Sequence, residues 1–268
     1  ASIYRAKGRP DFNPLIVHVP YVVQASRIAG FDARAERLAA QFWPGPLTMV
    51  LPLRSDAGLA AAVTAGLPTV ALRCPAHPVM RALLESCAFP LAAPSANRSG
   101  GVSPTTAAHV SASLGERIDA IIDGGACRAG IESTIVALRQ DGGWQVLRPG
   151  PITAEQLRDV LGEAEAGADG RADVEAPGQL ASHYAPGKPV RLNADKALAD
   201  EFLIGFGPVV GNVNLSPDGD LAEAAARLYE ALHQAAAADQ PRIAVAPIPE
   251  QGIGQAINDR LRRAAAPQ

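Results

Sequence analysis

The feature that most constrains the fold is the alternation of strand-like and helix-like segments over the first 161 residues. Short apolar runs are typical of buried strands, and apolar residues at helical spacing are typical of amphipathic helices. The predicted strands are 15–19, 48–53, 69–73, 90–93, 118–123, 134–138 and 144–147, and the predicted helices are 31–42, 77–87 and 105–111. Thr153 and Gln156 form a capping box, which predicts a further helix to about Leu161. This order predicts an α/β domain with a large twisted mixed sheet.

The chain changes character after residue 161. Residues 162–189 are rich in Gly, Ala, Asp and Pro and lack hydrophobic periodicity, which is typical of a linker. Strands are predicted at 190–192, 209–213 and 242–245, and helices at about 221–237 and 253–264. This alternation predicts a small doubly wound, Rossmann-like domain over residues 190–268.

Composition excludes several classes of protein. Of the 268 residues, 48% are hydrophobic and 19% charged, which is typical of a globular protein. The net charge of -3 argues against a broad basic surface, so we expect no strong direct binding of nucleic acid. We find no apolar run of about 18 residues and expect no membrane span. Three cysteines and five histidines match no metal-ligand spacing, which predicts a reduced, cytoplasmic protein without a protein-held metal.

The first polar cluster is Lys7-Gly8-Arg9-Pro10, followed by Asn13 and then by His18 inside a predicted strand. In an extended segment, residues two apart face the same way, so Lys7 and Arg9 would point together into one pocket. Two converging positive charges suit a triphosphate. The alternative is two solvated surface cations.

Two further clusters lie beside predicted strands. Ala93–Gly101, closing with Ser103, offers small residues and hydroxyls that suit phosphate binding, although an ordinary polar turn is equally consistent. Ser133 follows Glu132 directly, and Arg148 ends a predicted strand one hairpin later. The alternatives are a strand-terminating serine and a surface charge.

Taken in order, these clusters closely resemble the YrdC-like threonylcarbamoyl-AMP synthases. The resemblance rests on KGRP with NPL and His18, FWPGPLT at 42–48, PSANRSG at 94–100, EST at 132–134 and LRPG at 147–150, and covers about residues 1–160. SHYAP at 182–186 and GQAINDRL at 254–261 resemble the two-domain branch, which has a C-terminal accessory domain. The family's further N-terminal segment, with its Thr-Tyr-Gly-Leu motif, is absent. The sequence begins at Ala1 inside the predicted end of a helix, so we expect an N-terminal piece to be missing.

The resemblance implies a reaction and a set of site residues. Bicarbonate and the L-threonine amine form a carbamate that attacks the α-phosphorus of ATP and expels pyrophosphate. The product would pass to the tRNA threonylcarbamoyl transferase machinery, and Mg²⁺ would arrive bound to ATP. The implied ATP-binding residues are Lys7, Arg9, Asn13, Thr69, Ser95, Asn97, Ser103, Arg148, His183 and Tyr184, of which Lys7, Arg9, Ser95 and Asn97 would be catalytic. The implied threonine-binding residues are His18, Arg73, Ala93 and Ser133.

Three alternatives stay open at this stage. A related carbamoyl-adenylate enzyme could use another amine or carbamoyl donor. A double-stranded RNA-binding module without catalysis is disfavoured because a basic-aromatic stripe is missing. The tail could also be purely an interaction domain. Within the linker, His183 and Tyr184 suggest a lid over the active site, with simple packing of Tyr184 as the alternative.

Overall fold

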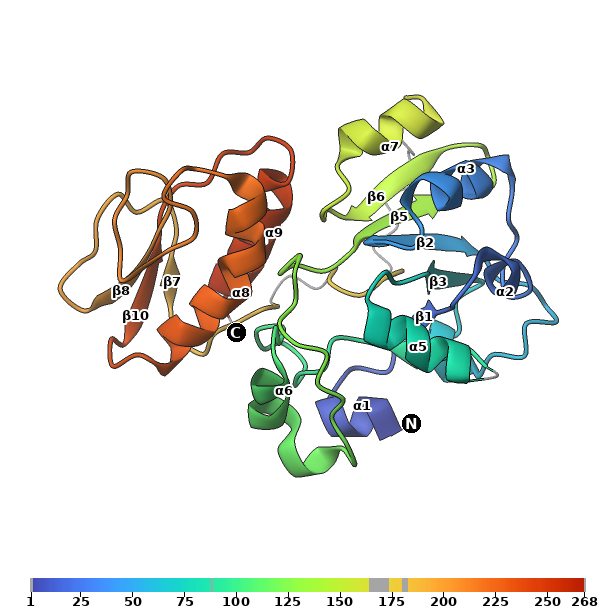
Figure 1. Cartoon of the computed structure of the whole chain (residues 1–268), viewed down its shortest axis with the longest axis horizontal. Helices are drawn as coiled ribbons and strands as arrows, with labels where there is room; N and C mark the ends of the chain where they lie inside the picture. The colour runs from blue at the N-terminus through green and yellow to red at the C-terminus, as the bar shows by residue number, and fades with distance from the viewer. Residues whose placement is uncertain (1, 88, 164–173, 180–182, 268) are drawn as a thin grey trace. The chain divides into compact units, whose positions relative to one another are not determined.

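The computed structural model describes residues 2–87, 89–163, 174–179 and 183–267, and the chain forms two compact units (Figure 1). The first unit comprises Ala1–Tyr4, Arg9–Pro94 and Ser133–Gln179. The second comprises Arg5–Gly8, Ser95–Glu132 and Leu180–Gln268. The units follow spatial packing rather than chain order, and the domain boundaries at residues 161 and 190 stay a prediction.

The first unit is built on a six-stranded sheet in the order β4-β1-β3-β2-β5-β6. Its strands are β1 (Ile16–His18), β2 (Leu47–Pro52), β3 (Thr69–Arg73), β4 (Leu91–Ala93), β5 (Thr134–Leu138) and β6 (Trp144–Arg148). The pairs β1–β3 and β2–β5 are parallel and the other pairs are antiparallel. The predicted mixed sheet is therefore confirmed.

Helices cover one face of this sheet. Leu38 of α3 (Ala33–Phe42) and Leu157 of α7 (Ala154–Leu161) are fully buried in one cluster with Met49 and Leu72 of the strands. Thr153 and Gln156 make the predicted capping box at the start of α7. Residues on the opposite face form a separate buried cluster. The remaining helices of this unit are α2 (Val22–Ser26), α4 (Ala61–Thr64) and α5 (Pro78–Ser86).

The second unit contains a four-stranded parallel sheet in the order β7-β10-β8-β9. Its elements are β7 (Val190–Arg191), β8 (Glu201–Gly205), β9 (Val213–Asn214), β10 (Arg242–Val245), α6 (Ala107–Leu114), the 3₁₀ turn Gly115–Arg117, α8 (Leu221–Ala237) and α9 (Gly254–Ala265). Helix α1 (Ser2–Lys7) ends in this unit.

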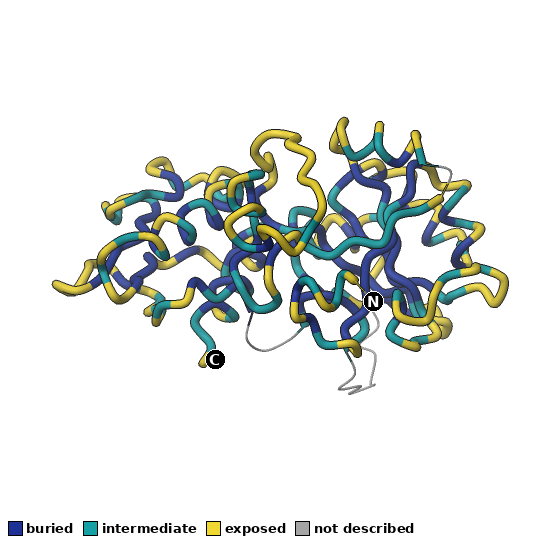
Figure 2. The backbone as a smooth tube through the Cα atoms, turned by 90° about the horizontal axis from the view of Figure 1, so that it is seen from below, coloured by how far each residue is buried: buried dark blue, intermediate teal, exposed yellow. Residues whose placement is uncertain are grey.

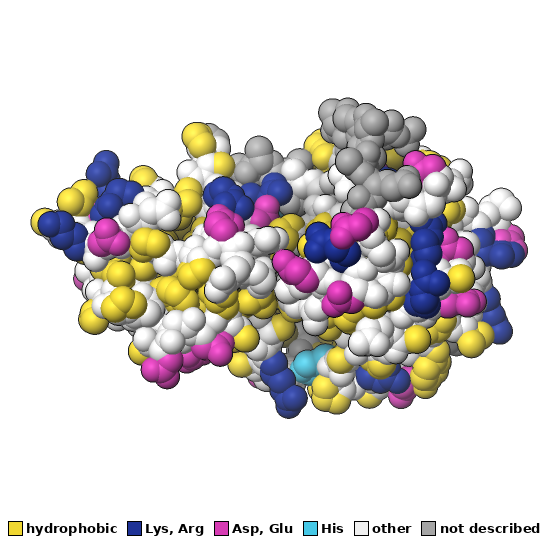
Figure 3. All heavy atoms as spheres, turned by 90° about the horizontal axis from the view of Figure 1, so that it is seen from above, with side chains coloured by type: hydrophobic (Ala, Val, Ile, Leu, Met, Phe, Trp, Pro, Cys, Tyr) yellow, Lys and Arg dark blue, Asp and Glu magenta, His cyan; other side chains and the backbone are white. Residues whose placement is uncertain are grey.

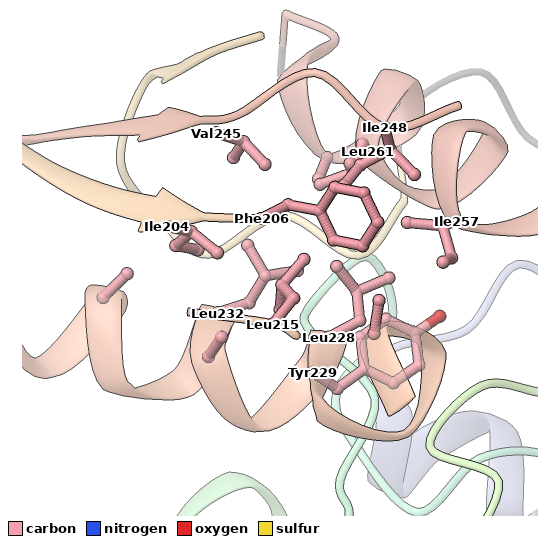
Figure 4. Close-up of a cluster of buried hydrophobic side chains, with 14 of the residues drawn as sticks. Ile204, Phe206, Leu215, Leu228, Tyr229, Leu232, Val245, Ile248, Ile257 and Leu261 are labelled. Atoms are coloured by element: carbon pink, nitrogen blue, oxygen red, sulfur yellow. The ribbon is translucent and has the colours of Figure 1, made fainter. Parts of the chain in front are cut away.

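Both long helices of the second unit pack on the same face of its sheet. Ile204 and Val245 lie in one cluster with Leu232 of α8 and Leu261 of α9 (Figure 4). The intervening strand residue Leu203 belongs to a different, smaller cluster, which contains no residue of α8 or α9. The Rossmann-like arrangement, with helices on both faces, is therefore not confirmed for the described residues.

Two strand predictions are wrong. Residues 118–123 form no strand, and Ile122 is 64% exposed. The strand predicted at 209–213 begins only at Val213, and the unpredicted strand β8 occupies the buried position beside β10. By contrast, β3, β10 and α8 have the predicted bounds.

The buried stretches of both units coincide with the sheets and with the inner sides of the helices (Figure 2). On the face that Figure 3 shows, acidic and basic side chains are interspersed among the described residues. No helix in the described ranges is long and apolar enough to cross a membrane.

Candidate active site

Six of the predicted site residues share one face of the first unit's sheet. His18 lies two residues after Ile16 on β1, and Thr69 and Arg73 each lie two residues from Ala71 on β3. Because every second residue of a strand points to the same face, all three side chains lie on the face of the Ile16–Ala71 cluster. Directly paired residues of neighbouring strands point the same way. Ala93 therefore joins this face through Ile16, Arg148 joins it through Ile135, and Ser133 joins it two residues before Ile135. This is the face opposite the α3 and α7 helices.

His18 and Arg73 end two neighbouring parallel strands and are directly paired in the sheet. Arg73 Nε donates to the carbonyl oxygen of Gly45 at 3.1 Å. Burial, and then the positive charge of Arg73, lower the pKa of His18 from 6.5 to about 4. His18 is therefore neutral at pH 7. Its Nδ1 is buried and has no hydrogen-bond partner among the described residues, which leaves an acceptor or donor for a ligand.

Ser133 lies just before β5 and is fixed by two neighbours. Its hydroxyl is 2.7 Å from Thr48 Oγ1, and Arg148 Nη2 donates to the Ser133 hydroxyl at 3.1 Å. Arg148 Nε and Nη2 also donate to the Ser133 carbonyl oxygen at 3.1 and 2.9 Å. Arg148 is only 4% exposed, so the surface-charge alternative is wrong for this residue. Arg148 instead holds Ser133 in place.

Arg9 is buried at the approach to β1 and is held by neutral acceptors. Its Nε donates to the Asn13 carbonyl at 3.0 Å, and its Nη2 donates to Asn13 Oδ1 at 2.6 Å and to the Pro14 carbonyl at 2.8 Å. Burial lowers the pKa of Arg9, but a guanidinium remains protonated at neutral pH.

Lys7 lies in the second unit and is buried against the loop that follows β4. Its Nζ donates to the Ser95 carbonyl at 2.6 Å, to the Asn97 carbonyl, and to Asn97 Oδ1 at 3.2 Å. Ser95 Oγ donates to the same Asn97 Oδ1 at 2.6 Å. Asn97 Nδ2 in turn donates to the Gly101 carbonyl at 2.9 Å. The positive charge of Lys7 therefore lies inside the Ser95–Gly101 loop rather than in solvent.

The geometric reason given for pairing Lys7 with Arg9 is wrong. Lys7 is the last residue of helix α1 rather than part of an extended segment, and Gly8 has a φ of 62°. The alternation of side chains in an extended chain therefore does not apply across these residues.

Ser103 belongs to a buried polar network that sequence reasoning missed. Its hydroxyl donates to Glu132 Oε1 at 2.5 Å. Glu132 Oε2 accepts from the Tyr229 hydroxyl at 2.8 Å and from Arg260 Nε at 3.0 Å. The signal was present in the sequence, because Glu132 precedes Ser133 and Arg260 belongs to the quoted GQAINDRL stretch. Their 128-residue separation hides the pair from any local pattern.

The predicted lid residues His183 and Tyr184 lie in the second unit, and the serine before them in the quoted SHYAP stretch is outside the described residues. Tyr184 is 1% exposed and adopts a left-handed φ of 63°. Its ring stacks on Tyr229 at 5.5 Å, and the Arg260 guanidinium lies 5.4 Å from its centroid. The His183 ring is 4.1 Å from the Tyr184 ring. In this conformation Tyr184 is a core residue.

The chain matches known proteins over almost all of its length. Residues 1–150 match a family described as "Telomere recombination", the Sua5–YciO–YrdC group. Residues 152–266 match one described as "Threonylcarbamoyl-AMP synthase, C-terminal domain". Curated proteins named threonylcarbamoyl-AMP synthase are 38% identical in Bacillus subtilis and 37% identical in Pyrococcus abyssi. Both alignments cover 98% of this chain, and they cover 82% and 83% of those proteins, respectively.

Solved structures agree with this assignment. The Sua5 protein of P. abyssi complexed with L-threonine superposes with a TM-score of 0.87 at 35% identity, covering 98% of this chain and 83% of that one. A variant of the same protein, in which adjacent His and Tyr residues are replaced by Ala, gives a TM-score of 0.86 at 33% identity, covering 98% and 82%. The chain therefore belongs to the Sua5–YciO–YrdC family and carries the C-terminal domain of the threonylcarbamoyl-AMP synthases.

Proposed function

We propose that this protein is an enzyme, an L-threonylcarbamoyladenylate synthase of the nucleotidyltransferase type. The observation that carries the proposal is the gathering of His18, Arg73 and Ser133 on one sheet face. It occurs in a chain whose relatives bear that name. The product would serve threonylcarbamoyladenosine modification of tRNA.

Threonine would bind at the edge of the sheet where β1 and β3 end. Arg73 supplies a guanidinium for the amino-acid carboxylate. The unpartnered Nδ1 of the neutral His18 can accept a hydrogen bond from a donor group of threonine. The hydroxyl of Ser133 and the backbone at Ala93 complete the proposed site. The relative from P. abyssi, which has the same fold, has been solved with L-threonine bound.

ATP would be held by cationic, amide and hydroxyl side chains. The candidates are Lys7, Arg9, Asn13, Thr69, Ser95, Asn97, Ser103 and Arg148, with His183 and Tyr184 from the linker. The buried guanidinium of Arg9 carries a positive charge that suits a phosphate oxygen, and the Lys7 charge raises the positive potential of the Ser95–Gly101 loop. Fixed positive charges of this kind stabilise the charge that develops on a transferring phosphoryl group.

The reaction needs alignment more than covalent assistance. The threonine amine nitrogen bonds to the carbon of bicarbonate and water leaves, which gives the carbamate. A carbamate oxygen then bonds to the α-phosphorus, the bond from that phosphorus to the bridging oxygen breaks, and pyrophosphate leaves. Because the carbamate is labile, a site that excludes water favours the second step.

Mg²⁺ would enter with the triphosphate. The candidate residues on the sheet face are cationic, imidazole or hydroxyl groups, whereas Mg²⁺ prefers carboxylate and phosphate oxygens. The carboxylate that precedes Ser133 in the sequence, Glu132, already accepts from Ser103, Tyr229 and Arg260. When bound, the metal would neutralise charge on the phosphates, while the residues above fix their position.

The linker contacts the candidate face of the first unit's sheet. Residues 174–179 already cover part of the candidate face, because Ala176 is fully buried in its cluster and the Pro177 carbonyl accepts from Arg148 Nη1 at 3.4 Å. We infer that the linker closes over bound ATP as a lid. The product would then pass to the tRNA threonylcarbamoyl transferase machinery in the cytoplasm.

The test of the proposed function is direct. The protein is incubated with ATP, bicarbonate and labelled L-threonine, and threonylcarbamoyl-AMP and pyrophosphate are measured. Omission of bicarbonate is the matched control and should abolish both products. Pyrophosphate release that needs neither threonine nor bicarbonate would contradict the proposal and favour a related enzyme acting on another amine or carbamoyl donor.

A further inference from the structure

Thr48 is a fully buried hydroxyl residue on the candidate face of the first unit's sheet. It pairs with Ile135 across the parallel strands β2 and β5, and it lies two residues before Val50 on β2. Val50 and Ile135 both belong to the buried cluster of the candidate face. Since every second residue of a strand points to the same face, the Thr48 side chain lies on this face too.

Thr48 lies between two of the groups that would hold threonine. The antiparallel ladder of β2 and β3 ends at the pair Met49 and Leu72, and the next residues along these strands are Thr48 and Arg73. On the other side, Thr48 Oγ1 is 2.7 Å from Ser133 Oγ. Thr48 is therefore next to Arg73 in the sheet register and is hydrogen-bonded to Ser133.

The Thr48–Ser133 pair has one hydroxyl proton more than it uses. Each hydroxyl carries one proton, and the bond between them takes one of the two. Arg148 Nη2 donates to Ser133 Oγ at 3.1 Å, and a guanidinium cannot accept. Neither hydroxyl has a further partner among the described residues. Thr48 is 0% and Ser133 1% exposed, so the remaining proton is a buried donor without an acceptor in this part of the chain.

This unused donor points to a ligand that accepts. A hydroxyl buried without an acceptor is destabilising, because it has given up its hydrogen bonds to water. Nδ1 of His18, on the same sheet face, is also buried without a hydrogen-bond partner among the described residues. Two polar groups of one face thus lack partners, which is typical of a binding site rather than of a core.

The ligand group that fits this donor is a carboxylate. Of the polar groups of threonine, the ammonium only donates and the hydroxyl can do both, whereas the carboxylate only accepts. Arg73, next to Thr48 in the sheet, supplies a guanidinium that suits the same group. The carboxylate would then accept one charge-assisted bond from Arg73 and one bond from the hydroxyl pair.

An anionic ligand also decides which hydroxyl of the pair donates to the other. If Thr48 donates to Ser133, Ser133 Oγ accepts from both Thr48 and Arg148 and keeps its own proton for the ligand. A hydroxyl that accepts from a guanidinium is polarised and donates more strongly to an anion. The opposite direction would present the Thr48 proton, which lacks this polarisation. The first arrangement is therefore favoured when a carboxylate binds.

We propose that Thr48 is a positioning residue of the amino-acid site, which donates to Ser133 and so directs the Ser133 hydroxyl to the carboxylate of bound threonine. This inference rests on the proposed function, since it takes L-threonine as the ligand of this sheet face. It gives a role to the last residue of the FWPGPLT stretch.

The test is a double-mutant cycle of Thr48→Val and Ser133→Ala, with L-threonine affinity measured by titration calorimetry. Thr48→Val keeps a β-branched side chain of almost the same shape and should weaken threonine binding about three- to tenfold. Ser133→Ala should weaken it about tenfold. In the Ser133→Ala background, Thr48→Val should change the affinity by less than about twofold, because the hydroxyl through which Thr48 acts is gone. Thr48→Ser restores the donor and should bind threonine within about twofold of the unaltered protein.

The matched control is Thr64→Val, which removes another buried threonine hydroxyl of the same unit. The Thr64 hydroxyl donates to the Ala61 carbonyl at 3.3 Å within helix α4 and is not part of the proposed site. This variant should leave threonine affinity unchanged, whatever its effect on the unfolding temperature. If circular dichroism shows that Thr48→Val does not fold, Thr48→Cys replaces it in the same cycle, since a thiol is only a weak donor.

Three results in the variants would overturn the inference. They are unchanged threonine affinity in Thr48→Val, additive losses in the double variant, and a loss in Thr48→Ser as large as that in Thr48→Val. Absence of threonine binding to the unaltered protein would overturn it as well. Because the readout is binding rather than turnover, the outcome stays separate from the proposed reaction. A protein that binds threonine through this pair but forms no adenylate would reject the reaction and retain the positioning role.

Discussion

The depressed pKa of His18 has a measurable consequence for stability. In the unfolded chain the imidazole titrates near 6.5, whereas in the folded protein burial and Arg73 bring its pKa to about 4. Between these values the unfolded state binds a proton that the folded state does not. The free energy of unfolding therefore rises with pH in this window and is lost as the pH falls from about 6.5 toward 4.

The size of the effect follows from the two pKa values. A difference of one pKa unit corresponds to about 1.4 kcal/mol, and lowering the pH from about 7 to about 5 should remove roughly 2 kcal/mol that is due to His18. His18→Gln keeps a polar side chain of similar length but cannot titrate. It should lose this component of the pH dependence.

The assay can be confined to the first unit, because the two tryptophans, Trp43 and Trp144, both lie in its core. Urea unfolding followed by tryptophan fluorescence at pH 7 and pH 5 gives the free energy of unfolding of each variant. His77→Gln is the matched control, since this histidine is exposed in the same unit, and it should retain the full pH dependence. If the His18→Gln variant lost as much free energy of unfolding between pH 7 and pH 5 as the protein with His18, the inference that the His18 imidazole is buried and neutral would be refuted.

Four further outcomes are expected. Arg9→Ala should weaken ATP binding about tenfold to a hundredfold in calorimetry, because it removes a charge-assisted contact, whereas the exposed Arg5→Ala should leave the affinity unchanged. In pyrophosphate-release assays, a site that bonds the threonine hydroxyl should reject valine strongly and serine only modestly; valine turnover equal to that of threonine would exclude such a site. Gly130→Ala should lower the free energy of unfolding by at least about 2 kcal/mol in thermal unfolding followed by circular dichroism, since it combines a left-handed φ with a clash against Ala225. Hydrogen exchange across residues 178–188 should slow when ATP and threonine are added; unchanged exchange would reject the lid.

The sequence predicts elements well where local signals and burial agree. Strand β3 and helix α8 have the predicted bounds. A compact apolar run predicts the strand and a long amphipathic repeat predicts the helix, and in both cases the burial in the folded protein agrees with the local pattern. The sequence analysis did not predict strand β8, because the strand begins at Glu201 and glutamate is seldom buried in a strand. Arg191 explains the exception, since its guanidinium bonds both Glu201 oxygens at 2.8 and 2.6 Å. The ion pair with Arg191 of β7 allows Glu201 to be buried, and the sequence of β8 alone does not reveal this partner.

The candidate site shows the same division. Motif order points to Lys7, Arg9 and Ser133, but the orientation of each side chain depends on tertiary contacts. Helix α1 ends at Lys7, which removes the extended geometry on which its pairing with Arg9 was argued. The Glu132–Arg260 pair joins residues 128 positions apart, and no periodicity connects them. Local patterns therefore identify the chemical groups, whereas long-range packing decides which atoms they present.

A buried arginine with a carboxylate partner differs from one without, because only the second still lacks a negative charge that a ligand could supply. Arg260 is 0% exposed and has the Glu132 carboxylate at 3.0 Å, which is the usual way in which a protein tolerates a buried cation. Arg9 is 8% exposed, yet its hydrogen-bond partners are two carbonyl oxygens, one amide oxygen and the Tyr4 side chain, and no carboxylate lies within ion-pair distance among the described residues. Neutral acceptors orient the guanidinium but leave its charge uncompensated, so burial costs more there than at an ion pair. An anionic ligand would supply the missing compensation. The burial of Arg9 among neutral acceptors favours a phosphate-binding role over the solvated surface cation that was the alternative from sequence.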